Sequence, residues 1–208
     1  MVRVKICGIT NLEDARSAGR LGADALGFNF YEKSVRFVTP TAAAEMISQL
    51  EEPVDKVGVF VNHTIDEILN AVELASLDAV QLHGDESPRF ITDLRARCDC
   101  RVIKALRVSP EFDLNESLEY HADGILLDGY STNARGGTGE TFDWDVAKRT
   151  STLIPELWLA GGLTPENVRL AVTEVRPYAV DACSSLESTP GMKDATKLER
   201  FISEAKSA

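Results

Sequence analysis

Long apolar segments are missing from this sequence. No run of hydrophobic residues approaches the roughly 20 that a membrane-spanning helix needs. The first residues hold too few apolar side chains before Cys7 and Gly8 to form a secretory signal, and they predict a β-strand instead. We therefore expect a cytoplasmic protein with no membrane partner.

Positive charge is also scarce. The chain has 22 Lys and Arg against 33 Asp and Glu, which gives a formal net charge of −11. Nucleic acids and anionic membranes need a basic surface, so neither is an expected partner. An anionic ligand would have to be bound by local groups, such as helix N-termini and individual cations.

Cysteine and histidine are few, with four and three residues respectively. Cys7 and Cys183 lie at opposite ends of the sequence, whereas Cys98 and Cys100 are separated by one residue. No C-x-x-C spacing or accompanying histidine cluster is present. The sequence therefore predicts neither a disulfide framework nor a metal site.

The sequence does contain a repeated unit, a short apolar strand followed in most cases by an amphipathic helix. Strands are expected at residues 2–7, 25–30, 56–61, 79–82, 101–106, 124–127, 157–160 and 178–180. Helices are expected at 11–21, 40–50, 64–75, 87–97 and 164–172, with N-caps at Asn11, Thr39, Thr64, Ser87 and Thr164. The first strand–helix turn lacks the G-x-G-x-x-G of a dinucleotide-binding fold. We predict an α/β fold, a single-domain (β/α)8 TIM barrel spanning residues 1–208.

Polar residues gather where the expected strands end, which is where barrels of this kind carry their active sites. This group comprises Cys7, Asn29, Ser34, Arg36, Asn62, His63, Gln81, His83, Asp85, Asp128 and Asp181. Stability alone does not explain such a distribution, and it favours an enzyme. For single residues a second interpretation stays open: Cys7 also fits a buried structural cysteine, and His83 a hydrogen-bonded structural histidine.

The loops after strands seven and eight predict a phosphate site. Gly161 and Gly162 lead into a helix, where glycine lets the backbone approach an anion, and Ser184 and Ser185 add hydroxyl and amide groups. A simple tight turn is the alternative for the two glycines. The glycine-rich stretch 135–139 of the long sixth loop fits a lid over a ligand, or else a disordered connection.

Several motifs together resemble the phosphoribosylanthranilate isomerase family of tryptophan biosynthesis. These motifs cover nearly the whole chain and follow the family's order. KICGIT and QLHGDE are the motifs most specific to the family. The motifs are KICGIT (5–10), the segment with Ser34 and Arg36, GVFVN (58–62), QLHGDE (81–86), LLDG (126–129), GGTGETFDW (136–144), AGGLTPENV (160–168) and PGMKD (190–194).

The resemblance implies an Amadori rearrangement of N-(5-phosphoribosyl)anthranilate that uses no metal and no cofactor. By matching motif, Cys7 is the general base and Asp128 the general acid. Arg36 is then expected to bind the anthranilate carboxylate, and His83 and Asp181 to line the substrate pocket. The phosphate is assigned to Gly161, Gly162, Ser184 and Ser185.

The chain departs from the family in the loop after strand eight. The family pattern is roughly D-V-S-S-G-V-E, whereas residues 181–187 read Asp-Ala-Cys-Ser-Ser-Leu-Glu. Cys183 therefore replaces a serine, and Ser185 replaces a glycine. Since glycine accepts backbone conformations that serine tolerates poorly, we expect the phosphate contacts of this loop to differ in detail.

Two other functions are weighed against this one. A metal-dependent pentose-phosphate epimerase needs paired His and Asp ligands at strand ends, but His121 precedes its strand. An indole-glycerol-phosphate synthase needs catalytic lysines at the barrel mouth, but Lys104 lies within strand five. An inactive barrel that binds a sugar phosphate is the non-enzymatic alternative. The sequence is compatible with a monomer or a homodimer.

Overall fold

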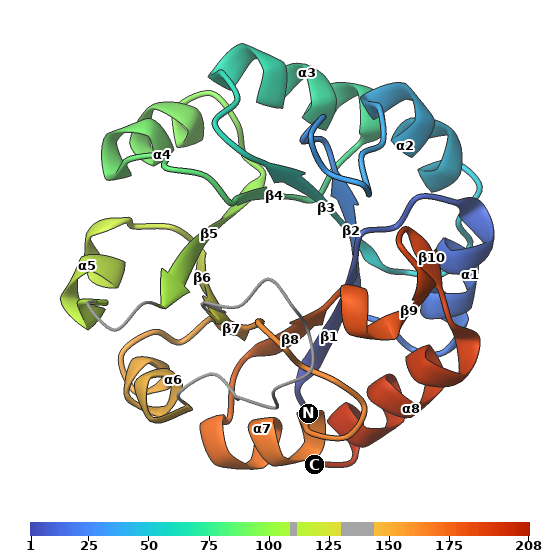
Figure 1. Cartoon of the computed structure of the whole chain (residues 1–208). Coiled ribbons are helices and arrows are strands. Elements are labelled where there is room, and N and C mark those ends of the chain that lie inside the picture. The colour runs from blue at the N-terminus through green and yellow to red at the C-terminus, as the bar shows by residue number, and fades with distance from the viewer. Residues whose placement is uncertain (109–111, 130–143) are drawn as a thin grey trace.

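The computed structural model describes residues 1–108, 112–129 and 144–208. Eight parallel strands hydrogen-bond in chain order and close into a barrel, because β8 pairs with β1 (Figure 1). The predicted TIM barrel is confirmed. The strands are β1 (Arg3–Cys7), β2 (Ala25–Asn29), β3 (Asp55–Phe60), β4 (Ala79–Leu82), β5 (Arg101–Val108), β6 (Gly124–Gly129), β7 (Leu157–Leu159) and β8 (Ala179–Ala182).

Helices surround the barrel on its outer face (Figure 1). They are α1 (Leu12–Arg20), α2 (Pro40–Ile47), α3 (Ile65–Ala75), α4 (Pro88–Arg95), α5 (Leu114–Glu119), α6 (Trp144–Ser151), α7 (Val168–Val175) and α8 (Ala195–Lys206). After β8 come the short 3-10 helix η1 (Ser184–Leu186) and an antiparallel pair, β9 (Glu187–Thr189) and β10 (Met192–Lys193). Among the described residues, no helix is long and apolar enough to cross a membrane.

The predicted N-caps are confirmed at α1, α2, α3 and α4, where the cap side chains accept a backbone N–H of the first turn. The fifth, Thr164, is wrong. The Asn167 side chain accepts the backbone N–H of Thr164 at 2.8 Å and donates to the Gly162 carbonyl at 3.0 Å. These bonds stabilise a turn at 164–167, so Pro165 lies before α7, which begins at Val168.

Strand residues alternate between two cores. One set packs outward against the helices and forms the larger apolar cluster. The other set points into the barrel and fills its interior away from the carboxyl ends of the strands, with Trp158 as its largest member. That inner cluster comprises Ala25, Val57, Ala79, Ile103, Ala105, Leu126, Trp158, Ala160 and Ala179. Because this inner cluster fills that part of the barrel, the room for a ligand lies at the carboxyl ends of the strands.

One expectation about the cysteines is wrong. The structure joins Cys98 and Cys100 by a disulfide, although the sequence predicts none. The two residues lie in the turn between α4 and β5, where the chain bends enough to bring their Cα atoms to 5.4 Å. That separation lies within the range that a disulfide accepts. Cys7 and Cys183 are free thiols.

A buried ion pair supports the loop after β4. Lys104 donates to Glu86 at 2.8 Å and to the Gly84 carbonyl at 2.6 Å, and both charged side chains are 2% exposed. Glu86 also accepts the backbone N–H of Asn62 at 2.8 Å. The loop that carries part of the barrel mouth therefore depends on this pair.

We expect Glu86→Ala to lower the free energy of unfolding by about 3–5 kcal/mol, because Lys104 would remain buried without its counter-charge. The matched control is Asp66→Ala, which breaks the exposed Arg97–Asp66 pair at 2.7 Å and should change stability by about 1 kcal/mol or less. Urea unfolding followed by circular dichroism measures both. Equal losses in the two variants would contradict the structural role of the buried pair.

Candidate active site

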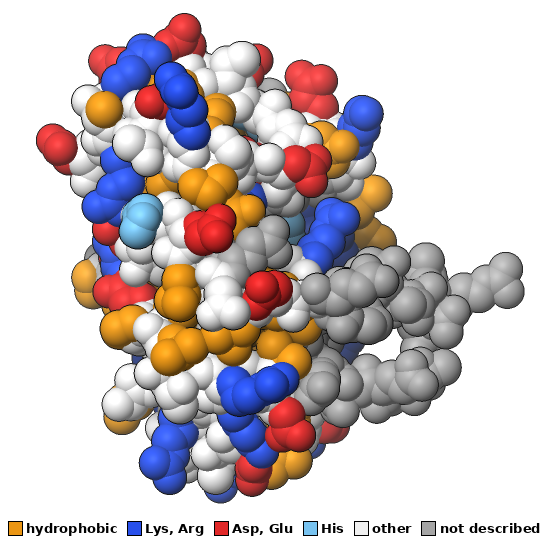
Figure 2. Space-filling model, turned by 90° about the vertical axis from the view of Figure 1, so that its left-hand side faces the viewer, with side chains coloured by type: hydrophobic (Ala, Val, Ile, Leu, Met, Phe, Trp, Pro, Cys, Tyr) orange, Lys and Arg blue, Asp and Glu red, His pale blue; other side chains and the backbone are white. Residues whose placement is uncertain are grey.

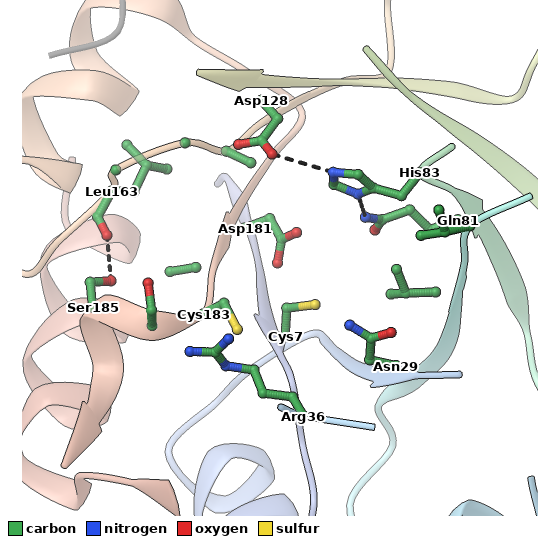
Figure 3. A pocket seen from close by; sticks show the side chains of 17 residues that line it. Cys7, Asn29, Arg36, Gln81, His83, Asp128, Leu163, Asp181, Cys183 and Ser185 are labelled. Carbon is green, nitrogen blue, oxygen red and sulfur yellow. Dashed lines mark hydrogen bonds and ion pairs between the residues drawn. The ribbon is translucent and has the colours of Figure 1, made fainter. Parts of the chain in front are cut away.

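A cavity of about 330 Å³ opens at the carboxyl ends of the strands. It brings together every residue that the sequence assigned to a site (Figure 3). Asn29, Gln81 and Cys183 line the same cavity. The predicted site residues around it are Cys7, Arg36, His83, Asp128, Gly161, Gly162, Asp181, Ser184 and Ser185.

The floor of the cavity is a buried ion pair. Lys5 on β1 donates to Asp181 on β8 at 2.8 Å, and the Lys5 side chain is fully buried. Burial, followed by the nearby Cys7 thiolate, raises the pKa of Asp181 to about 7, although the Lys5 charge acts in the opposite direction. The second oxygen of Asp181, Oδ1, is buried and has no hydrogen-bond partner in the described part of the chain. It is left available to a ligand.

Cys7 lies at the end of β1, above Lys5. A hydrogen bond from the Cys183 thiol and the positive charges of Lys5 and Lys193 hold the pKa of Cys7 well below that of an ordinary thiol, against the opposing effect of burial. Gly27 on β2 makes room for it, because a Cβ there would lie 2.8 Å from the Cys7 sulfur. The surroundings thus favour the thiolate, the form that accepts a proton.

Asp128 belongs to a hydrogen-bonded chain of three residues (Figure 3). Gln81 Nε2 lies 2.9 Å from His83 Nδ1, and His83 Nε2 lies 3.3 Å from Asp128 Oδ2. If the Gln81 amide donates, the imidazole proton is on Nε2 and points at Asp128. Gln81 is 1% exposed, so its orientation is set by packing. The arrangement fixes Asp128 at the mouth of the barrel.

Arg36 makes a two-point ion pair that the sequence analysis did not foresee. Its Nε donates to Glu187 Oε1 at 2.7 Å, and its Nη2 donates to Oε2 at 2.6 Å. Lys193 also donates to Glu187, at 3.1 Å. The guanidinium carries five N–H donors, so this pair orients Arg36 while leaving others for a ligand.

The two phosphate-loop serines lie in η1, so Ser185 does not adopt the left-handed backbone that favours glycine. Its hydroxyl donates to the Leu163 carbonyl at 2.5 Å and ties the loop after β8 to the loop after β7. The expected difference in detail is therefore a cross-link between the loops, without backbone strain. Gly161 and Gly162 do have positive φ, of 80° and 74°.

Comparisons with known proteins agree with this geometry. Residues 4–204 match the family described as N-(5'-phosphoribosyl)anthranilate (PRA) isomerase. The chain belongs to the phosphoribosylanthranilate isomerase family. An isomerase of this name from Geobacter sulfurreducens is 50% identical over 209 residues, covering 99% of each chain.

Solved isomerase structures show the same fold at full length. That of Thermotoga maritima superposes with a TM-score of 0.92 at 46% identity, covering 100% of both chains. Another phosphoribosyl anthranilate isomerase, solved in complex with reduced 1-(o-carboxyphenylamino)-1-deoxyribulose 5-phosphate, superposes with a TM-score of 0.89 at 43% identity, again over 100% of both chains.

Relative to the family motifs, sequence reasoning missed four contributors to the site: Lys5, Cys183, Glu187 and Lys193. One signal in the sequence could have identified Lys5. Arg3, Lys5 and Cys7 alternate with apolar residues, which is the pattern of a strand with a polar inner face. The predicted lid, residues 135–139, lies outside the described residues. Within the described ranges, no three His, Cys, Asp or Glu residues are grouped as metal ligands.

The adjacent glycines of the isomerase loop should respond differently to alanine. A Cβ at Gly161 would lie 2.0 Å from the backbone nitrogen of Gly129, so we expect Gly161→Ala to destabilise the fold by about 2–4 kcal/mol. A Cβ at Gly162 meets no atom within 4 Å, so Gly162→Ala should lose only about 1–2 kcal/mol. Thermal unfolding of the two variants measures the difference in stability.

The second readout of this pair is substrate affinity. Gly162 lines the cavity, so its added methyl group would occupy the space where the phosphate is expected and should raise KM. If Gly162→Ala left KM unchanged, the phosphate assignment of this loop would be wrong. If Gly161→Ala were as stable as Gly162→Ala, the close approach to Gly129 would not matter.

Proposed function

We propose that Cys7 and Asp128 carry out the two proton transfers of the family's reaction at this barrel mouth. The reaction is the conversion of N-(5'-phosphoribosyl)anthranilate to 1-(2-carboxyphenylamino)-1-deoxyribulose 5-phosphate, an aldose–ketose isomerisation of tryptophan biosynthesis. The observation that carries the proposal is that a thiolate-favouring cysteine and a fixed carboxyl group, from β1 and β6, face one cavity.

The chemistry requires an acid and a base in separate places. Asp128 donates a proton to the furanose ring oxygen, which opens the ring to a Schiff base. The Cys7 thiolate then removes the proton from C2, and the electrons move to the nitrogen to give an enolamine. Tautomerisation of the enolamine gives the ketose product. No atoms are gained or lost, and because the two side chains carry out both proton transfers, no step is assigned to a cofactor or a metal.

The remaining pocket residues bind the substrate in this proposal. Arg36, oriented by Glu187, binds the anthranilate carboxylate with its unused donors. His83 holds Asp128, and the free Oδ1 of Asp181 accepts a sugar hydroxyl. Gly161, Gly162, Ser184 and Ser185 enclose the phosphate, largely through backbone amides because the Ser185 hydroxyl is engaged.

The decisive experiment is the decay of substrate fluorescence with purified protein in EDTA. We expect full turnover of phosphoribosylanthranilate without added metal. Loss of activity on chelation, restored by a divalent metal, would favour a metal-dependent sugar-phosphate epimerase. Binding of the substrate without turnover would indicate an inactive barrel.

The pH profile of kcat/KM tests the base. Since Cys7 acts as the thiolate, activity is kept above its pKa and lost as the pH falls through it, so the acid limb should lie well below the usual thiol value of about 8.5. Cys183→Ala removes the hydrogen bond that contributes most to this shift and should move the limb to higher pH. The control is Cys98→Ser with Cys100→Ser, which should leave it in place. An unmoved limb in Cys183→Ala would contradict the assignment.

The expected setting of the enzyme is the cytoplasm, with a small-molecule substrate and no nucleic acid or membrane partner. Acidic and basic side chains are interspersed on the face shown in Figure 2 and form no broad basic patch there. One solved relative consists of monomers generated from the dimeric isomerase of Thermotoga maritima. We expect a monomer or a homodimer for this chain, which light scattering distinguishes.

A further inference from the structure

Two free cysteines line the cavity at the seam of the barrel, where β8 meets β1. In the parallel pairing of β1 with β8, Lys5 lies opposite Asp181 and Ile6 lies opposite Ala182. The next residues are Cys7, the last residue of β1, and Cys183, which directly follows β8. Neighbouring strands are about 4.8 Å apart. That spacing falls within the Cα separation of about 4.4–6.8 Å that disulfides accept.

Both side chains face the cavity. Lys5 and Asp181 meet inside the barrel, and Cys7, two positions further along β1, returns to the same face, while Cys183 follows β8 directly. Cys7 and Cys183 accordingly both line the cavity, and Figure 3 shows their side chains as neighbours above Arg36. The two thiols are close enough for Cys183 to lower the pKa of Cys7. The Cys7 sulfur lies beside Gly27 and the Cys183 sulfur beside Gly8, so both side chains must rotate for the sulfurs to join.

The charges around the pair favour reaction with an oxidant. Lys193 Nζ lies 3.9 Å from the Cys183 sulfur, and Lys5 lies below Cys7. Glu187 Oε1, 4.0 Å from the Cys183 sulfur, is itself neutralised by Arg36 and Lys193. A thiolate beside cations, open to a cavity, is the form that reacts with peroxides.

We propose that Cys7 and Cys183 form a peroxide-oxidisable thiol pair that closes to a disulfide. The Cys7 thiolate attacks one oxygen of hydrogen peroxide, the O–O bond breaks, and hydroxide leaves, giving a sulfenic acid. The Cys183 sulfur, having given up its proton, attacks the Cys7 sulfur and expels a second hydroxide as the S–O bond breaks. The two thiol protons convert both hydroxides to water. Peroxide is reduced by two electrons, and the sulfurs are oxidised by two.

The modification removes the thiolate that the proposed function requires, so its effect on turnover rests on that function. The disulfide itself does not. A dithiol reductant reverses the bond by thiol–disulfide exchange and is itself oxidised. The Cys183 position, where the family pattern has serine, therefore makes the site reversibly oxidisable.

The experiment uses the Cys98→Ser, Cys100→Ser protein, whose only cysteines are Cys7 and Cys183. After treatment with hydrogen peroxide, we expect the intact mass to fall by two hydrogen atoms and a peptide joining the two cysteines to appear. Turnover should fall by about 10²-fold or more and return with dithiothreitol. Adding Cys183→Ser should instead leave Cys7 to gain two oxygen atoms, with no recovery by dithiothreitol.

The outcomes separate the two proposals. Both thiols remaining open to alkylation after peroxide, or a sulfenic acid at Cys7 that persists in the presence of Cys183, would overturn the thiol pair. A linked peptide with undiminished turnover would leave the pair standing and instead contradict Cys7 as the base.

Discussion

Cys7→Ala should lower kcat by about 10²–10⁴-fold while leaving the protein folded. The substitution removes the thiol at the end of β1, and the neighbouring Lys5 cannot replace it as a base. Lys5 is held as a cation by Asp181, and the free oxygen of Asp181 lies at the floor of the cavity. The measurement is single-turnover decay of substrate fluorescence, with circular dichroism to verify folding.

The control for this variant is the Cys98→Ser, Cys100→Ser protein, which changes two cysteines outside the cavity and should keep its turnover. KM supplies a second criterion. Because a general base acts in the transition state, its loss should reduce kcat and leave substrate binding nearly unaltered. Wild-type turnover in Cys7→Ala would remove Cys7 from the mechanism.

Asp128→Asn should reduce kcat by a similar factor of about 10²–10⁴. Asparagine has nearly the shape of aspartate and can still accept the His83 hydrogen bond through its carbonyl oxygen, so the hydrogen-bonded chain is preserved. What it cannot do is donate a carboxylic proton to the ring oxygen. The variant therefore tests proton donation separately from positioning.

Its matched control is Asp66→Asn, an equal change of charge on α3 outside the cavity, which should retain activity. A substrate analogue with an already opened ring offers a sharper comparison. Asp128→Asn should process that analogue far better than the natural substrate, whereas Cys7→Ala should fail on both. Equal impairment of Asp128→Asn on the two substrates would contradict its role in ring opening.

The strand–helix period predicted the barrel well because the strand pattern and the helix pattern both reflect the burial of apolar side chains. Short apolar strands between amphipathic helices have few ways to bury both faces of a parallel sheet. Local hydrogen bonding also made most helix starts legible, as at Thr64, where the capping box is fully formed. The Thr164 prediction failed because residues 165–167 form a turn that the Asn167 side chain ties back to Thr164, and α7 begins only after this turn.

The site was less accessible to sequence reasoning. Position at strand ends identified the residues that face the cavity, but their partners depend on register. Arg36 and Glu187 are 151 residues apart, and only the folded barrel brings them together. The same holds for Cys183, whose replacement of a serine was visible in the sequence, whereas its place beside Cys7 in the cavity depends on the closure of the barrel. Ion pairs between residues far apart in the sequence leave no pattern in the sequence around either residue.

The closure of the barrel by β1 and β8 has a consequence for biosynthesis. Lys5 finds its counter-ion at Asp181, and Asp14 accepts the backbone N–H of Lys193 at 2.8 Å. A nascent chain that has emerged only through β7 therefore exposes Cys7 and an unpaired lysine on an open sheet edge. The ribosome must deliver residues 179–193 before either is enclosed. A chain that ends before residue 179 is therefore expected to lack the buried counter-ion of Lys5.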